Sequence, residues 1–239
     1  MTGRMIDFDA NGSPARGYLA TPDAGAGPGV VVLHAWWGLT EPFQQVCDRL
    51  AEAGFVALAP DLYQGKTTAS VEEAETLARA LNGEEERVRA DIRGAVEFLR
   101  QQGSQGQHAA TNPAGGGDKV GVVGFSMGGA YALDTSVELA EEIAAVVIFY
   151  ATYTGLDFGR AQAAYLGHFA EQDPFEPAES VAELEQELKS AGKQATFYTY
   201  PGTTHWFFEA NRPDAYDAAA AALAWERTLA FLNAQLRSA

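Results

Sequence analysis

The stretch KVGVVGFSMGG, residues 119–129, decides the fold that this sequence predicts. Residues 120–125 are expected to form a strand, and a helix is expected from Met127 onward. Between them the chain fits G-x-S-x-G, a pattern that places a serine on a sharp turn from strand to helix. Gly124 and Gly128 keep side chains out of the place where two backbones cross. We therefore expect Ser126 to project its hydroxyl from the end of a sheet; the alternative is a glycine-rich turn with an incidental serine.

Strands and helices alternate on both sides of this turn. We expect strands over residues 5–8, 15–21, 30–33, 55–59, 120–125, 143–150, 164–170 and 195–200. We expect helices over residues 41–53, 70–81, 84–100, 127–139, 181–191 and 215–236. Such alternation predicts an α/β fold with a mostly parallel central sheet and helices on both faces, in one domain over residues 1–239. The polar, glycine-rich stretch 101–118 is expected to be a mobile surface loop, since the alternation continues beyond it.

Composition excludes several classes of protein. The chain has 32 acidic and 16 basic residues, a net charge of −16, which disfavours binding to a phosphate backbone. No apolar stretch is long enough to span a membrane, and the first residues lack a secretion signal. The single cysteine, Cys47, cannot form an intrachain disulfide and is expected in the core. We expect a cytoplasmic monomer or homodimer that binds neither nucleic acid nor membrane.

A serine hydroxyl needs a base, and His205 is the best candidate. It follows the strand predicted over residues 195–200, and carboxyl-end loops carry function in parallel sheets. The other histidines are expected to have other roles. His34 should shape the loop after its strand, and His108 should be exposed. His168 should be a core residue whose ring nitrogens have hydrogen-bond partners.

The base needs an acid that orients it, and Asp173 is favoured because it follows the strand predicted over residues 164–170. Its rivals are Glu171, Glu176 and the more distant Asp157. The chain order Ser126, Asp173, His205 is the one expected of α/β-hydrolases.

Two backbone N–H groups are expected to hold the oxyanion of the reaction. One belongs to Met127, which follows the serine, and the other to Trp36 in the loop after the strand over residues 30–33. Aromatic residues in or near carboxyl-end loops suggest an aromatic-walled pocket. They are Trp36, Trp37, Tyr63, Tyr150, Tyr153 and Trp206.

The chain resembles the dienelactone hydrolase family over nearly its whole length. The segments that carry the resemblance are VVLHAWWGL at 31–39, GFVALAPDLYQGK at 54–66, KVGVVGFSMGG at 119–129, EQDPFEP at 171–177, PGTTHWFF at 201–208 and YDAAAAALAWERTLAFL at 216–232. The resemblance implies an α/β-hydrolase without a large cap domain. It also implies that nucleophile, acid and base are Ser126, Asp173 and His205.

Three positions depart from the family's pattern. The usual nucleophile is cysteine, where this chain has Ser126, and the usual glutamate after the loop histidine is Ala35, which also enters the expected pocket. These two changes fit each other, because serine relies on histidine and has no use for an extra carboxylate. In the family, an arginine that follows the catalytic histidine binds the substrate. This chain has Glu209 four residues after His205, and Arg212 lies further along the chain. We therefore expect uncharged substrates to be preferred.

These residues predict a serine hydrolase that cleaves small carboxylic esters or lactones through an acyl-enzyme, without cofactor or metal. One alternative is an acyltransferase or cyclase that uses the same residues in a biosynthetic pathway, which product analysis with competing alcohols would reveal. Another is a non-catalytic, ligand-binding relative, which a fluorophosphonate probe would not label.

Overall fold

A computed structural model describes residues 3–105 and 119–237 of the chain. Its strands are β1 (Arg4–Ala10), β2 (Ser13–Ala20), β3 (Gly29–Leu33), β4 (Val56–Pro60), β5 (Val120–Phe125), β6 (Ile143–Phe149), β7 (Ala164–Gln172) and β8 (Ala195–Thr204). Its helices are α1 (Glu41–Glu52), α2 (Val71–Ala80), α3 (Glu85–Gln105), α4 (Met127–Glu138), α5 (Ala178–Ser190) and α6 (Ala218–Leu236). The strand order is β1-β2-β4-β3-β5-β6-β7-β8. The predicted α/β fold is confirmed.

The chain divides into two compact units, one up to Val122 and one from Val123 onward. Each unit is α/β in its own right. A single domain over residues 1–239 stays a prediction.

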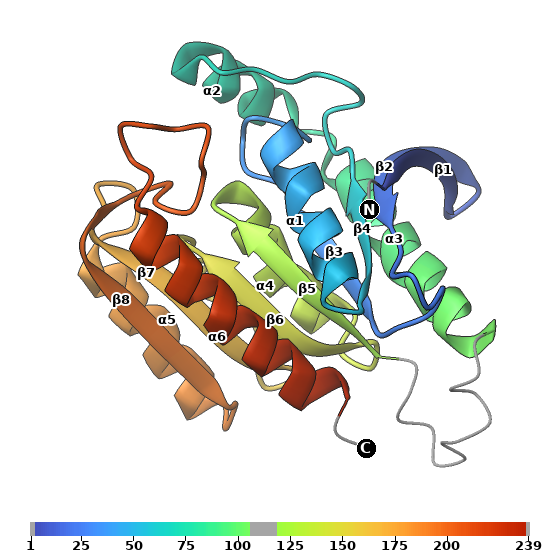
Figure 1. Ribbon diagram of the computed structural model, residues 1–239. Helices are drawn as coiled ribbons and strands as arrows, with labels where there is room; N and C mark the ends of the chain where they lie inside the picture. The colour runs from blue at the N-terminus through green and yellow to red at the C-terminus, as the bar shows by residue number, and fades with distance from the viewer. Residues whose placement is uncertain (1–2, 106–118, 238–239) are drawn as a thin grey trace. The chain divides into compact units, whose positions relative to one another are not determined.

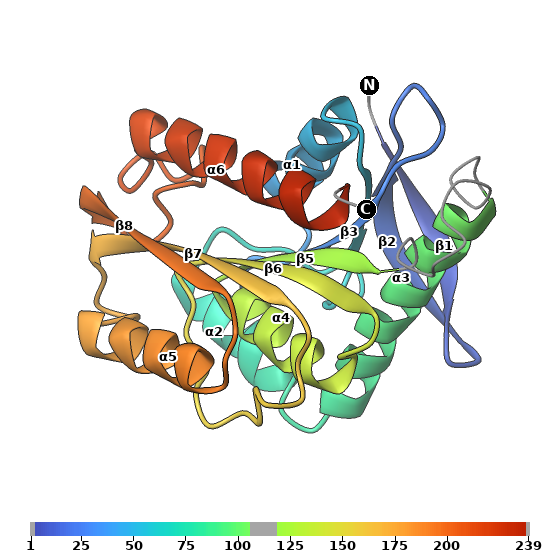
Figure 2. The same cartoon turned by 90° about the horizontal axis from the view of Figure 1, so that it is seen from below.

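The first unit opens with an antiparallel hairpin of β1 and β2, joined at Asn11 and Gly12, both of which have positive φ. β2 also pairs antiparallel with β4, and β3 pairs parallel with β4. Figure 2 shows α1 on one face of these strands and α3 on the other. All five residues of β3 and of β4 are buried, as expected for strands covered on both faces. Cys47 is also fully buried, on α1, which confirms it as a core residue.

The second unit contains parallel pairs, β6 with β7 and β7 with β8. Helix α6 covers one face of these strands, while α4 and α5 cover the other (Figures 1 and 2). Between sheet and α6 lies an aromatic cluster in which Phe125 stacks on Phe149 at 4.7 Å between ring centroids and Phe208 packs on both. The cluster fixes the ends of β5 and β6, where the loops of the site begin.

Several predicted boundaries were wrong. Helix α3 continues through residues 101–105, which were expected in the loop; residues 106–118, including His108, lie outside the described residues. Helix α5 begins at Ala178 because Pro177 is its N-cap, and α6 begins at Ala218 because the Asp217 side chain caps it through the Ala220 N–H at 2.8 Å.

The start of α2 shows a relayed version of a capping box, in which the N-cap side chain and a carboxylate three residues later bond to each other's backbone N–H groups. Ser70 Oγ accepts from the Glu73 N–H at 3.5 Å. The Glu73 carboxylate, however, accepts from the Thr68 hydroxyl at 2.6 Å, and Thr68 Oγ1 accepts from the Ser70 N–H at 3.0 Å. Thr68 therefore stands between the two residues of the box.

Every helix within residues 3–105 and 119–237 is too short or too polar to cross a bilayer.

Candidate active site

Ser126 sits on a tight turn between β5 and α4. Its backbone has φ 49° and ψ −117°, a region that L-residues rarely adopt. A Cβ on Gly124 would lie 2.3 Å from the Gly128 carbonyl oxygen, and a Cβ on Gly129 would lie 2.4 Å from the Cβ of Ala151. The turn therefore depends on these glycines, and the predicted strand–turn–helix geometry is confirmed.

The register of β7 and β8 brings the next two functional residues together. These strands run further than predicted, and an irregularity shifts their register so that Gln172 pairs with Thr204. Asp173 and His205 directly follow these two partners. Irregular pairing next to a site commonly re-aims side chains in this way.

Ser126, His205 and Asp173 form a continuous hydrogen-bonded chain. Ser126 Oγ lies 3.1 Å from His205 Nε2, and His205 Nδ1 lies 2.7 Å from Asp173 Oδ2. Because a carboxylate only accepts, Nδ1 donates to Asp173 and Nε2 is left to accept the serine proton. The Asp173 Oδ1 atom accepts from the backbone N–H groups of Phe175 at 2.9 Å and Glu176 at 3.1 Å, which holds the carboxylate in place.

The rival carboxylates have other roles. Glu171 Oε2 accepts from the Gly202 N–H at 2.8 Å, so it ties the two loops together. The Glu176 carboxyl accepts from the Thr152 hydroxyl, and burial raises the pKa of Glu176 to about 7. Asp157 is exposed. Among the carboxylates weighed, Asp173 is the one that contacts His205.

Two other histidines are structural. His168 is fully buried between the Tyr200 hydroxyl at 2.9 Å and Thr228 Oγ1 at 3.0 Å, and burial lowers its pKa to about 3. His34 lies 2.7 Å from the Ala35 carbonyl through Nδ1, while Nε2 accepts from the Leu62 N–H at 3.3 Å. Burial lowers the pKa of His34 as well, so both rings are neutral, as predicted for a core residue and a loop-shaping residue.

Three side chains act as a frame around the His205 imidazole. Their ring centroids lie 4.8 Å (Tyr150), 4.9 Å (Phe175) and 5.1 Å (Trp206) from that of His205. Phe175 was not predicted; it is 52% exposed, and its position two residues after Asp173 is the signal that could have identified it. Tyr153 is exposed as well.

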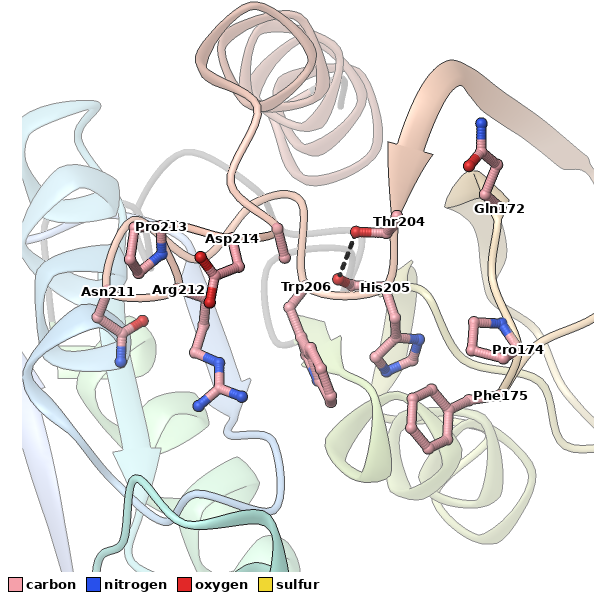
Figure 3. Close-up of a pocket in the computed structure, with 11 residues that line it drawn as sticks. Gln172, Pro174, Phe175, Thr204, His205, Trp206, Asn211, Arg212, Pro213 and Asp214 are labelled. Atoms are coloured by element: carbon pink, nitrogen blue, oxygen red, sulfur yellow. Dashed lines mark hydrogen bonds between the residues drawn. The ribbon is translucent and has the colours of Figure 1, made fainter.

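A cavity of about 460 Å³ lies beside His205. In Figure 3 the Trp206 ring stands between Arg212 and the imidazole, and Phe175 lies on the far side of the imidazole. The guanidinium of Arg212 lies 4.9 Å from the centre of the Trp206 ring, a cation–π distance. The cavity therefore offers aromatic surface with a cation at one end.

Glu209 does not line the cavity beside His205. Its side chain is 2% exposed and accepts from the Tyr150 hydroxyl at 2.8 Å. Arg212, not Glu209, lines the cavity. The expected preference for uncharged substrates therefore rests only on the net charge of −16.

The remaining predicted residues belong to the first unit. Ala35, Trp37 and Tyr63 are buried there, while Trp36 is half-buried with its ring 5.4 Å from that of Trp37. Their part in the substrate pocket stays a prediction. So does the pairing of the Trp36 and Met127 N–H groups at an oxyanion, because the two residues lie in different units.

The α/β sheet, the serine on its strand-to-helix turn and the chain order Ser126, Asp173, His205 together define an α/β-hydrolase. A family comparison then narrows the class: residues 15–236 match the dienelactone hydrolase family, and the chain belongs to it.

Relatives cover the chain almost completely. Protein usf of Aquifex pyrophilus is 35% identical, over 98% of this chain and 99% of its own length. A protein of Aquifex aeolicus named as a carboxymethylenebutenolidase is 31% identical, over 98% of this chain and 100% of its own. The crystal structure of a dienelactone hydrolase-like promiscuous phosphotriesterase from metagenomic libraries has a TM-score of 0.80 at 23% identity, covering 98% of both chains. The protein is thus a hydrolase of the carboxylic-ester and lactone class, with no separate cap domain in the part that the structure describes.

Proposed function

We propose that this protein hydrolyses small carboxylic esters or lactones through an acyl-enzyme on Ser126. His205 is the general base and Asp173 orients it. The observation that carries the proposal is the chain of two hydrogen bonds, 3.1 Å from Ser126 Oγ to His205 Nε2 and 2.7 Å from His205 Nδ1 to Asp173 Oδ2.

The acylation step follows from these contacts. His205 Nε2 takes the hydroxyl proton while Ser126 Oγ attacks the carbonyl carbon, and the carbonyl electron pair moves onto oxygen. The N–H of Met127, at the start of α4, stabilises this oxyanion. The amino-terminal dipole of α4 favours the same negative charge. Nε2–H then gives its proton to the leaving alkoxide, and the acyl-enzyme remains.

Deacylation runs through the same residues in reverse. His205 removes a proton from water, the hydroxide attacks the acyl carbon, and the proton returns to Ser126 Oγ as the acid leaves. For a lactone the leaving alkoxide stays attached to the acyl group, so one hydroxy acid is released.

The cavity beside His205 supports a small substrate with an apolar body. Phe175 and Trp206 supply flat aromatic walls, and Arg212 stands at one end of the cavity. The relative from Aquifex aeolicus carries a name that denotes cleavage of an unsaturated lactone. We therefore propose small lactones together with short-chain esters as the substrate class.

Covalent labelling tests this function directly. A fluorophosphonate should add once to the intact protein, and peptide mass spectrometry should map the adduct to Ser126, because phosphonylation needs a nucleophile with an adjacent base. Prior treatment with an excess of substrate should slow the labelling. An adduct at another residue, or none at all, would remove the basis for the acyl-enzyme.

Ser126 and Ala35 are expected to form a matched pair. Ser126→Cys alone should lower kcat/KM by about 100-fold, the scale of a lost acid–base contribution, because the thiol lacks the family's activating glutamate. Ala35→Glu should recover activity in the cysteine protein. In the serine protein it should be neutral or harmful, since Ala35 is fully buried and burying a further carboxylate is costly.

These four proteins form a double-mutant cycle, measured as kcat/KM with a p-nitrophenyl ester. Thermal melting of each variant separates lost activity from lost folding, which matters because a glutamate at position 35 is buried. Additive effects, with no coupling between the two positions, would mean that Ala35 is incidental.

A further inference from the structure

Tyr150 and Glu209 form a buried polar pair behind the imidazole of His205. Tyr150 is fully buried, Glu209 is 2% exposed, and the Tyr150 hydroxyl donates to Glu209 Oε1 at 2.8 Å. The mechanism described above uses neither side chain. Burying a carboxylate is costly unless it is well hydrogen-bonded, so its place here calls for a function.

The pair connects the two loops that must stay in register during catalysis. Tyr150 directly follows β6 with φ 41°, next to Phe149, whose carbonyl accepts from the Ser126 N–H at 2.9 Å. Glu209 lies four residues after His205, and its N–H donates to the Trp206 carbonyl at 2.9 Å. The Tyr150–Glu209 bond thus ties the histidine loop to the strand end beside the nucleophile.

The Tyr150 ring also lies against the imidazole. The two centroids are 4.8 Å apart with 56° between the planes, within the range of about 6 Å over which a ring attracts a cation. His205 becomes a cation when it takes the serine proton. A hydrogen bond from the phenol to a carboxylate pushes electron density toward the ring, which strengthens this attraction.

The ionisation of Tyr150 does not interfere with this role. Burial, together with the charge and hydrogen bond of Glu209, raises the pKa of Tyr150 well above its usual value. The hydroxyl therefore remains a donor throughout the working pH range. A hydrogen bond to a charged acceptor is also about twice as strong as one between neutral groups.

We propose that Tyr150 and Glu209 are positioning residues that stabilise the imidazolium form of His205, through the Tyr150 ring, and hold it toward Ser126. This rests on the proposed role of His205 as general base. The pair adds to Asp173: Asp173 stabilises the imidazolium through Nδ1, while Tyr150 does so through its ring, 4.8 Å away between centroids.

Other charges near His205 act on the same equilibrium. They are Asp173 on Nδ1, Glu176 beside Asp173 in the loop after β7, and Arg212 over the Trp206 ring with Asp214 lining the same cavity. The Asp173 and Asp214 carboxylates favour the imidazolium, Glu176 does so where its raised pKa leaves it ionised, and the guanidinium disfavours it. All four stay in place when Tyr150 or Glu209 is replaced, so a shift in the replaced proteins reports the pair.

The pH dependence of kcat/KM for p-nitrophenyl acetate tests the proposal, with Tyr150→Phe and Glu209→Gln. Acylation needs neutral His205, so kcat/KM rises with pH through the pKa of that residue. Losing imidazolium stabilisation lowers this pKa, and both variants should move the rising limb down by about half a pH unit. The plateau should fall about tenfold, the scale of a hydrogen bond to a charged group.

Tyr165→Phe is the matched control. Tyr165 is also a fully buried tyrosine, whose hydroxyl lies 2.8 Å from Ser136 Oγ at the opposite end of β7 from Asp173. It should lose a buried hydrogen bond and leave the pH profile unchanged.

The outcomes separate the two proposals. If the variants fold and the rising limb of kcat/KM stays at the wild-type pH, the inference is overturned, even if their rates fall. Failure of both variants to fold would also overturn it, since the pair would then serve folding alone. Either result leaves the acyl-enzyme intact as long as the fluorophosphonate still labels Ser126. Loss of that labelling in the unaltered protein would instead overturn the proposed function.

Discussion

Ser126→Ala is expected to lower kcat for ester hydrolysis on the order of a million-fold, the scale at which loss of the nucleophile acts in serine hydrolases. Alanine has no group that can form the acyl-enzyme. The fold should persist, because alanine meets the same backbone strain at φ 49° as serine does. The loss is measured as kcat with a p-nitrophenyl ester, beside circular dichroism and a melting curve.

Ser136→Ala supplies the control for this variant. Ser136 lies on the same helix, α4, fully buried, and its hydroxyl donates to the Leu133 carbonyl at 2.7 Å. Its removal should affect stability and leave kcat close to that of the unaltered protein. If Ser126→Ala retained more than about 1% of the activity, the residual rate would exceed what binding and an oxyanion site supply, and the nucleophile would have to be elsewhere.

Asp173→Asn should lower kcat about 10⁴-fold with little change in the fold. An amide cannot stabilise the imidazolium, and its NH₂ group facing Nδ1 would favour the tautomer that carries its proton on Nε2. That proton would occupy the position from which Ser126 must be deprotonated, 3.1 Å away. The measurement is kcat/KM together with the rate of fluorophosphonate labelling, both of which need a working base.

Glu176→Gln is the matched comparison, because this neighbouring carboxyl was a rival for the same role. It accepts from Thr152, and its backbone N–H donates to Asp173 at 3.1 Å. Its replacement should cost less than about tenfold, since the amide can still accept from Thr152. Losses of equal size in the two variants would make the assignment of Asp173 untenable.

The order of the elements could be predicted from sequence because each is marked locally. Continuous apolar runs identify strands covered on both faces, such as β3 and β4, and the Asn11-Gly12 turn identifies the first hairpin. Boundaries were harder, because caps decide them: Pro177 and Asp217 set where α5 and α6 begin. Hydrophobic periodicity alone predicted different first residues for both helices.

The serine and histidine of the site were also predictable, because a short pattern and a strand end locate them. The distance between Asp173 and His205 was not, since it depends on the shifted pairing of β7 with β8, which no local pattern encodes. The environment of Glu209 was missed for a related reason. Its partner, Tyr150, is 59 positions away in sequence, and an isolated acidic residue in a loop is usually solvated.

The strained backbone conformation of Ser126 sets activity against stability at a single position of the chain. A residue held at φ 49° and ψ −117° carries a cost of order 1–3 kcal/mol, which glycine alone would largely escape. Selection for a durable fold therefore favours glycine at position 126, whereas selection for turnover favours serine. Glycine at this position would relax the turn and remove the proposed nucleophile in one substitution, so the proposed activity requires a strained residue in the fold.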